Sequence, residues 1–133
     1  MGIVKDDTRP IRSGEDVVGV RKVVREWAVG AGFNLVDQTK IVTAASELAR
    51  NVLQYGGGGF IRLEALNGPR RGLRLVFEDQ GPGITDVERA LKDGFSTGGG
   101  LGLGLGGAKR LANEFEIQSE PGRGTRVTIT RWK

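Results

Sequence analysis

Residues 94–110 read GFSTGGGLGLGLGGAKR, and a helical segment, GAKRLANEF, runs on directly from this stretch. Glycine occupies eight of the seventeen positions, and leucine alternates with glycine through the middle. A flexible linker or a low-complexity tail would not lead straight into a helix. Glycine allows φ > 0 and leaves backbone N–H groups open, while a helix N-terminus adds a partial positive charge. The run therefore predicts a phosphate-binding loop, followed by a helix that begins around Leu103.

The predicted loop differs from the two best-known phosphate loops. No Gly-Lys-Ser/Thr follows it, as a Walker A loop requires, and no strand leads directly into it, as a dinucleotide fingerprint requires. We expect the leucines to pack beneath the loop and the glycine backbone to face the phosphates. The loop residues predicted to bind nucleotide are Gly98, Gly99, Gly100, Leu101, Gly102, Leu103 and Gly104.

The residue types that are missing narrow the chemistry. The chain has 133 residues, which predicts a single domain over 1–133, and it contains neither cysteine nor histidine. This excludes disulfides, thiolate nucleophiles, imidazole metal ligands and phosphohistidine. Carboxylates, amides, hydroxyls and backbone amides remain, and they suit phosphoryl transfer, where positioning and electrostatics dominate.

Charge and hydropathy bear on partners and location. The net charge is +4 and the pI about 9.9, but the basic residues are scattered and are not interleaved with aromatic residues. We therefore expect a solvated basic surface and no nucleic-acid partner. No apolar run approaches the ~20 residues that span a bilayer, and the N-terminus has no signal-peptide core. The sequence predicts a cytoplasmic protein without a membrane partner.

Hydrophobic periodicity predicts the remaining elements. Apolar residues recur at helical spacing over 14–30 and 36–55, and they alternate over 60–66 and 73–79, which form a predicted antiparallel hairpin. A short helix is expected over 85–93, and two further strands are expected within 114–132. Paired strands with helices elsewhere predict an α+β fold, a two-layer sandwich whose mixed, mostly antiparallel sheet carries helices on one face.

Glu47 and Asn51 lie four residues apart in SELARNVLQY, on one face of the second predicted helix. An amide oxygen is a suitable ligand for Mg²⁺, so Asn51 is the candidate metal ligand. A carboxylate can accept a proton from an attacking hydroxyl, so Glu47 is the candidate catalytic base. Taken alone, the pair equally fits an exposed polar helix face.

The segment DQGPGI (79–84) follows a predicted strand. Asp79 would hold a fixed acceptor there, suited to the exocyclic amine of adenine. Gly81 and Gly83 allow close backbone approach, and Ile84 completes the set that we assign to nucleotide binding. By itself the segment could also be a plain turn.

Together, Glu-x-x-x-Asn on a helix, Asp-x-Gly-x-Gly after a strand and a glycine-rich loop before a helix resemble the N, G1 and G2 boxes of the GHKL ATP-binding superfamily. Thr125 in GRGTRVTI is similar to the threonine that supports the adenine pocket in that superfamily. The resemblance spans nearly the whole chain, and it implies the GHKL fold with ATP and Mg²⁺ as cofactors.

Within the superfamily, SELARNVL, DQGPGI and STGGGLGLGLGGAKRL resemble small bacterial serine/threonine kinases of partner-switching systems, and most closely the stressosome switch kinases (RsbT type). The resemblance implies phosphorylation of STAS-domain scaffold and antagonist proteins. It also implies activation of a PP2C-type phosphatase, through the activation domain of that phosphatase. The alternative is an anti-sigma factor kinase that acts mainly as a nucleotide-gated binding module.

Overall fold

The computed structural model describes residues 2–84, 87 and 101–133, with the side chains of 101–104 excluded. In the described part, three helices and five strands follow one another along the chain. They are β1 (Gly2–Ile11), α1 (Gly14–Gly30), α2 (Leu35–Gln54), β2 (Gly59–Asn67), β3 (Gly72–Asp79), α4 (Leu101–Leu111), β4 (Glu114–Ser119) and β5 (Thr125–Trp132). The helix expected over 85–93 lies outside the described residues, apart from Val87.

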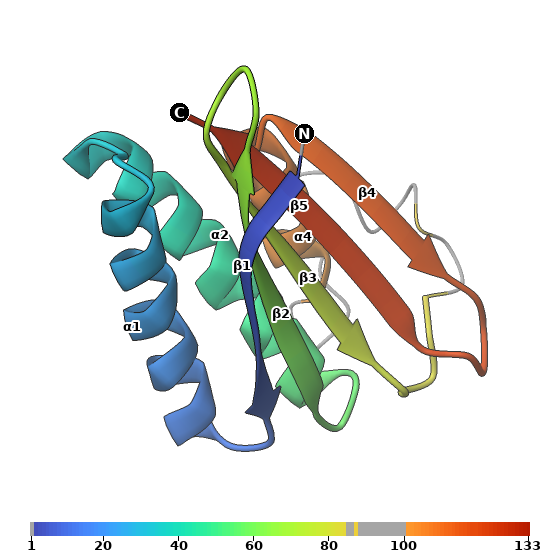
Figure 1. The fold of residues 1–133 in the computed structure, drawn as a ribbon. Coiled ribbons are helices and arrows are strands. Elements are labelled where there is room, and N and C mark those ends of the chain that lie inside the picture. Colours follow the sequence, from blue (N-terminus) through green and yellow to red (C-terminus); the bar gives the residue numbers. More distant parts are fainter. Residues whose placement is uncertain (1, 85–86, 88–100) are drawn as a thin grey trace.

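The five strands form one sheet in the order β1-β2-β3-β5-β4, with the helices on a single face (Figure 1). This confirms the two-layer α+β sandwich. Every pairing among the described strands is antiparallel. The expectation of a mixed sheet was therefore wrong for these strands.

Strand β1 was not predicted. It is an edge strand in which all but two residues are exposed, so it lacks the alternation that reveals a half-buried strand. Asp6, Asp7 and Pro10 also weigh against a strand in the sequence, although an edge position tolerates them.

The boundaries of the first two helices follow from their caps. The side chain of Ser13 accepts a hydrogen bond from the Asp16 N–H, and that of Asn34 accepts one from the Asp37 N–H. Each satisfies one N–H group that the first turn of a helix leaves open. The predicted helices over 14–30 and 36–55 are therefore confirmed to within one residue.

The core lies between the helices and the inner face of the sheet. Along β3, Leu73, Leu75 and Phe77 are buried, and the next inward position is Asp79, which is only 8% exposed. The partner of Asp79 on β5 is Thr125, so a polar pair ends two apolar rows of the inner face. This end of the core is therefore polar, whereas the rest of the inner face along β3 is apolar.

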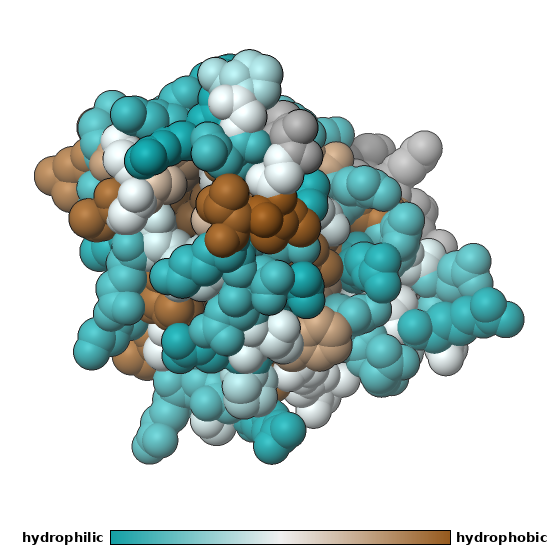
Figure 2. All heavy atoms as spheres, viewed as in Figure 1, coloured by the Kyte–Doolittle hydropathy of each residue, from teal (hydrophilic) through white to brown (hydrophobic). Residues whose placement is uncertain are grey.

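The opposite face of the sheet carries no helix in the described residues and is largely hydrophilic (Figure 2). Near its middle, Glu64 is bound by the guanidinium groups of Arg62 and Arg74. Burial alone would raise the pKa of Glu64, but the two hydrogen bonds from Arg62 and Arg74 outweigh it and lower the pKa. The ion pairs therefore stabilise this face without a second helical layer.

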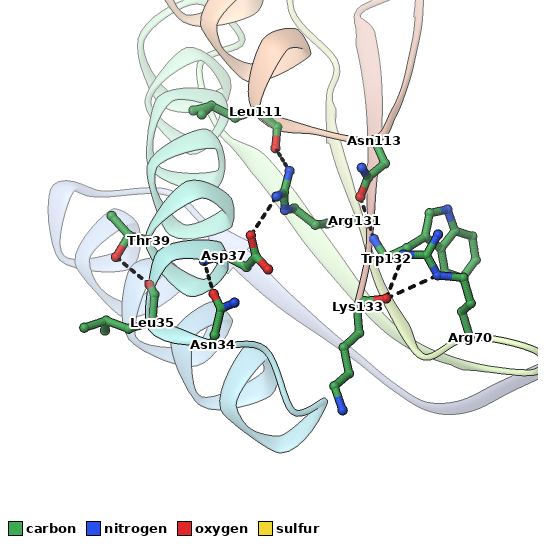
Figure 3. A network of polar contacts seen from close by, with 10 residues as sticks. All are labelled: Asn34, Leu35, Asp37, Thr39, Arg70, Leu111, Asn113, Arg131, Trp132 and Lys133. Atoms are coloured by element: carbon green, nitrogen blue, oxygen red, sulfur yellow. Dashed lines mark hydrogen bonds and ion pairs between the residues drawn. The ribbon is translucent and has the colours of Figure 1, made fainter.

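At the end of the sheet away from Asp79, Arg131 ties three elements together (Figure 3). Its guanidinium donates to the Leu111 carbonyl at the end of α4 and to the Asp37 carboxylate in the first turn of α2, both at 2.8 Å. The side chain is mostly buried, so this contact is shielded from solvent more than a surface pair. It fixes α4 against α2 and β5.

Candidate functional site

A pocket opens where the polar pair ends the inner face of the sheet. It is lined by residues of α2, β3, the segment after β3, α4 and β5, namely Leu48, Asn51, Val52, Tyr55, Gly56, Phe77, Asp79, Pro82, Gly83, Ile84, Leu105, Thr125 and Val127. Its free volume is about 30 Å³, which is room for one or two water molecules. A purine base is larger than this free volume.

Asp79 is the one acidic residue of this lining. Its Oδ1 accepts a hydrogen bond from the Gly81 N–H at 2.9 Å, and the carboxylate is also bonded by the Thr125 N–H. Burial raises the pKa of Asp79, and these two backbone bonds offset the rise only in part. Among the described residues no Lys or Arg pairs with this carboxylate, which leaves it able to accept from a neutral donor such as an amine.

Glycines pack closely around Asp79. A side chain on Gly56 would collide with the carboxyl group of Asp79, and one on Gly81 would lie 2.6 Å from Gly56 Cα. Gly83 (φ 77°) packs on the Glu120 carbonyl, and Gly124 (φ 82°) on that of Asp79. Gly81 and Gly83 thus allow other segments of the protein itself to pack closely against their backbone. Their contact with a nucleotide stays a prediction.

Asn51 carries an unpaired polar group at the pocket. Its Nδ2 atom is buried and has no hydrogen-bond partner among the described residues. The backbone carbonyl of Asn51 accepts from the N–H groups of Tyr55 and Gly56. The two ends of a side-chain amide are told apart only by their partners, so the buried group can equally be the oxygen. A buried amide without a partner fits the predicted role of Asn51 as a ligand for phosphate-bound Mg²⁺.

Glu47 lies one turn before Asn51 on α2 and does not line the pocket. Its carboxylate is 3.2 Å from Nη1 of Arg50, whose Nη2 binds the buried Ser46 hydroxyl at 3.1 Å. The Glu47 side chain is 37% exposed. The structure therefore leaves Glu47 open to an incoming molecule beside the pocket, and its role as a base stays a prediction.

The glycine-rich run is partly described. Gly98, Gly99 and Gly100 lie outside the described residues, whereas Leu101, Gly102, Leu103 and Gly104 belong to the first turn of α4. The helix thus begins two residues before the expected Leu103, and its backbone has negative rather than positive φ. The N–H groups of a first turn have no partners within the helix, so they remain able to bind an anion. Leu105 is buried and lines the pocket, and the packing of the leucines beneath the loop stays a prediction.

Thr125 lines the pocket beside Asp79. The resemblance to the GHKL superfamily implied this position for Thr125. Its hydroxyl is 2.8 Å from that of Ser119, which also binds the Ile84 N–H and the Gly124 carbonyl. The expectations for Asp79, Ile84 and Thr125 therefore converge on one pocket.

Gly56, Ser119 and Gly124 belong to the site but were missed in the sequence. Gly56 could have been noticed at the end of α2, where four glycines follow Tyr55. The contact of Ser119 with the Ile84 N–H gives no local signal, because the two residues lie 35 positions apart.

Among the described residues, no helix is both long enough and apolar enough to cross a membrane.

Comparison with known proteins agrees with this arrangement. Residues 36–133 match the family model for histidine kinase-, DNA gyrase B- and HSP90-like ATPases. Serine/threonine-protein kinase RsbT of Bacillus subtilis (strain 168) is 48% identical over 118 residues, covering 88% of this chain and 89% of the relative. An anti-sigma F factor of Thermoanaerobacter sp. (strain X514) is 29% identical, covering 84% and 82%.

Among solved structures, the RsbU and RsbW domains of Rv1364c from Mycobacterium tuberculosis align with a TM-score of 0.63 at 24% identity. The alignment covers 95% of this chain and 32% of that one, and at this identity it shows the fold alone. The family match and the similarity to RsbT establish the family as well as the fold. The chain belongs to the histidine kinase-, DNA gyrase B- and HSP90-like ATPase family, and within it to the group of the serine/threonine-protein kinase RsbT.

Proposed function

We propose that the chain is a protein kinase that transfers the γ-phosphoryl group of ATP to serine or threonine. One observation carries the proposal. Within the part of the chain that the structure describes, the buried Asp79 carboxylate has no cationic partner, and it shares a pocket with the Asn51 amide, whose buried Nδ2 has no hydrogen-bond partner there. The Asp79 carboxylate suits the exocyclic amine of adenine, and the Asn51 amide suits a phosphate-bound metal ion. The base and the phosphates of a nucleotide would therefore bind at different residues of the pocket.

The residues then divide the work. Asp79 and Thr125 hold adenine, and the backbone of residues 98–104 receives the phosphates at the N-terminus of α4. Asn51 would hold Mg²⁺, which would neutralise charge on the phosphates. Glu47 orients the acceptor hydroxyl and accepts its proton as the oxygen bonds to phosphorus and ADP leaves.

The protein substrates are proposed from the same family group. STAS-domain scaffold and antagonist proteins are the proposed phosphoacceptors, and a PP2C-type phosphatase is the proposed target of the released kinase, all in the cytoplasm. Support comes from the 48% identity with RsbT over most of both chains.

A second function is favoured by the 29% identity with anti-sigma F factors. In it, the chain sequesters a sigma factor when nucleotide is bound, and transfer is secondary. An exposed carboxylate at Glu47 favours the kinase, because sequestration requires no proton acceptor beside the phosphates.

The two functions are separated by incubating the chain with γ-labelled ATP, Mg²⁺ and purified STAS-domain proteins. The kinase predicts label on one Ser or Thr, identified by mass spectrometry and lost when that residue is replaced by Ala. Tight ATP-dependent binding to a sigma factor without label in any STAS protein would contradict the kinase and support the second function.

A further inference from the structure

The Ser119 hydroxyl, at the end of β4, makes three contacts. It accepts a hydrogen bond from the Ile84 N–H at 2.8 Å, lies 3.1 Å from the Gly124 carbonyl, and lies 2.8 Å from the Thr125 hydroxyl. These contacts hold the segment after β3 and the turn between β4 and β5 together at the pocket.

Counting protons fixes the direction of these bonds. A serine hydroxyl has one proton and two lone pairs, and a carbonyl can only accept. The proton of Ser119 therefore goes to Gly124, and its lone pairs receive the Ile84 N–H and the Thr125 O–H. With the reverse direction between Ser119 and Thr125, the carbonyl of Gly124, a buried residue, would face oxygen lone pairs instead of a proton.

The proton of Thr125 is thereby committed to Ser119. Thr125 Oγ1 then offers only lone pairs to the pocket, next to the Asp79 carboxylate on the neighbouring strand. Both side chains at this end of the pocket are acceptors. An exocyclic amine brings two N–H donors to such a pair, whereas a ring carbonyl brings another acceptor.

We infer that Ser119 is a specificity-determining residue, which sets the polarity of Thr125 so that the pocket selects a 6-amino purine over a 6-oxo purine. The inference rests on the proposed function, because it assumes that the base lies at Asp79. Ser119 acts through Thr125 and touches no ligand itself.

The test compares ADP with inosine diphosphate, which replaces the 6-amino group by a carbonyl oxygen and protonates N1. Calorimetry on the full chain gives the ratio of the two affinities. Wild type should prefer ADP by about tenfold or more, since an unpaired buried acceptor costs about that much. Ser119→Ala frees the Thr125 proton to turn toward the pocket, so the ratio should fall about fivefold.

Thr125→Val provides an independent variant if Ser119→Ala does not fold. It removes the acceptor, so ADP binding should weaken while inosine diphosphate binding does not, and the ratio should fall. If Thr125 instead donated into the pocket, the same substitution would weaken inosine diphosphate binding and raise the ratio. Thr128→Val, on the same strand but the outer face, is the matched control and should keep the wild-type ratio.

Each outcome decides one question. A wild-type ratio that persists in folded Ser119→Ala, or one that rises in Thr125→Val, overturns the inference and leaves the proposed function standing. Equal affinities in wild type also overturn the inference alone. A wild type that binds neither nucleotide overturns the proposed function together with the inference.

Discussion

Gly56 lies directly against Asp79, and a Cβ atom at position 56 would be 2.7 Å from Asp79 Oδ2 and closer still to its Cβ and Cγ atoms. Gly56, which follows the C-cap Tyr55 of α2, is thus in direct contact with the Asp79 carboxyl. Gly81 also packs against Gly56, so the carboxyl of Asp79 and two glycine backbones meet at one point.

Gly56→Ala should therefore displace the Asp79 carboxyl and weaken ATP binding. A carboxylate moved from its donor loses a buried hydrogen bond worth about 1–3 kcal/mol, so we expect a loss of about tenfold or more in affinity by calorimetry. Folding should weaken as well, by about 1–3 kcal/mol, as in other overpacked sites.

Gly107→Ala is the matched control for this change. A Cβ on Gly107 meets no atom within 4 Å, and the residue lies inside α4. The substitution should keep the affinity for ATP and stabilise the helix by about 0.5–1 kcal/mol. ATP binding that is the same in Gly56→Ala and in wild type would remove Asp79 from the adenine pocket.

Asp79→Asn should stabilise the fold at neutral pH. Burial raises the pKa of Asp79 in the folded chain above its value in the unfolded chain. At a pH above the folded-state pKa, the ionised carboxylate therefore lowers the free energy of unfolding. At a pH below the unfolded-state pKa, Asp79 is protonated in both states and the loss disappears. The variant should melt at a higher temperature than wild type at neutral pH, and the gap should close below about pH 4.

Glu64→Gln should behave in the opposite way. The pKa of Glu64 is lowered overall, because Arg62 and Arg74 outweigh its burial, so the ionised form stabilises the fold above its unfolded pKa. This variant should melt below wild type at neutral pH, and its deficit should vanish as acid protonates Glu64 in the wild type. Thermal unfolding at acid and neutral pH measures the difference in melting temperature between each variant and wild type. A difference that does not change with pH in either variant contradicts the account of that carboxyl.

Asn51→Ala tests the metal ligand. The buried unpaired amide of Asn51 is the group that we assign to Mg²⁺, so its removal should flatten the dependence of ATP affinity on Mg²⁺ concentration. Nucleotide titrations at a series of Mg²⁺ concentrations measure this. Superimposable curves for variant and wild type would place the metal ligand elsewhere.

Much of this fold follows from local pattern. The 2-residue period of β3 and the helical spacing of apolar residues in α1 and α2 depend on neighbouring residues, so the sequence predicts these elements closely. Strand β1 escapes prediction because an exposed edge strand needs no apolar alternation. The start of α4 is also misplaced, since helix propensity disfavours glycine whereas the structure places Gly102 and Gly104 in the first turn.

The site divides in the same way. Asp79 and Asn51 can be singled out because their spacing within a strand and a helix gives each a definite face. The contacts of Ser119 and Gly56 depend on how distant segments pack, namely the turn after β4 and the end of α2 against the residues that follow β3. Nothing in their immediate neighbours encodes those contacts.

Glu47→Gln tests most directly whether the chain is a kinase. The substitution keeps the size of the side chain and breaks only an exposed pair with Arg50, worth about 0.5 kcal/mol or less, so the fold should persist. Glu15→Gln, in the first turn of α1, removes an exposed carboxylate that does not line the pocket and serves as control.

The measurement is single-turnover phosphorylation of a STAS-domain protein, taken with the ATP affinity of each variant. A positioned base contributes ~10²–10⁴-fold to transfer and little to ground-state binding. Glu47→Gln should therefore bind ATP as wild type does and transfer phosphate at least about a hundredfold more slowly, while Glu15→Gln matches wild type in both. Equal transfer rates in Glu47→Gln and wild type, or a wild type that binds ATP and partner tightly yet transfers nothing, would contradict the account.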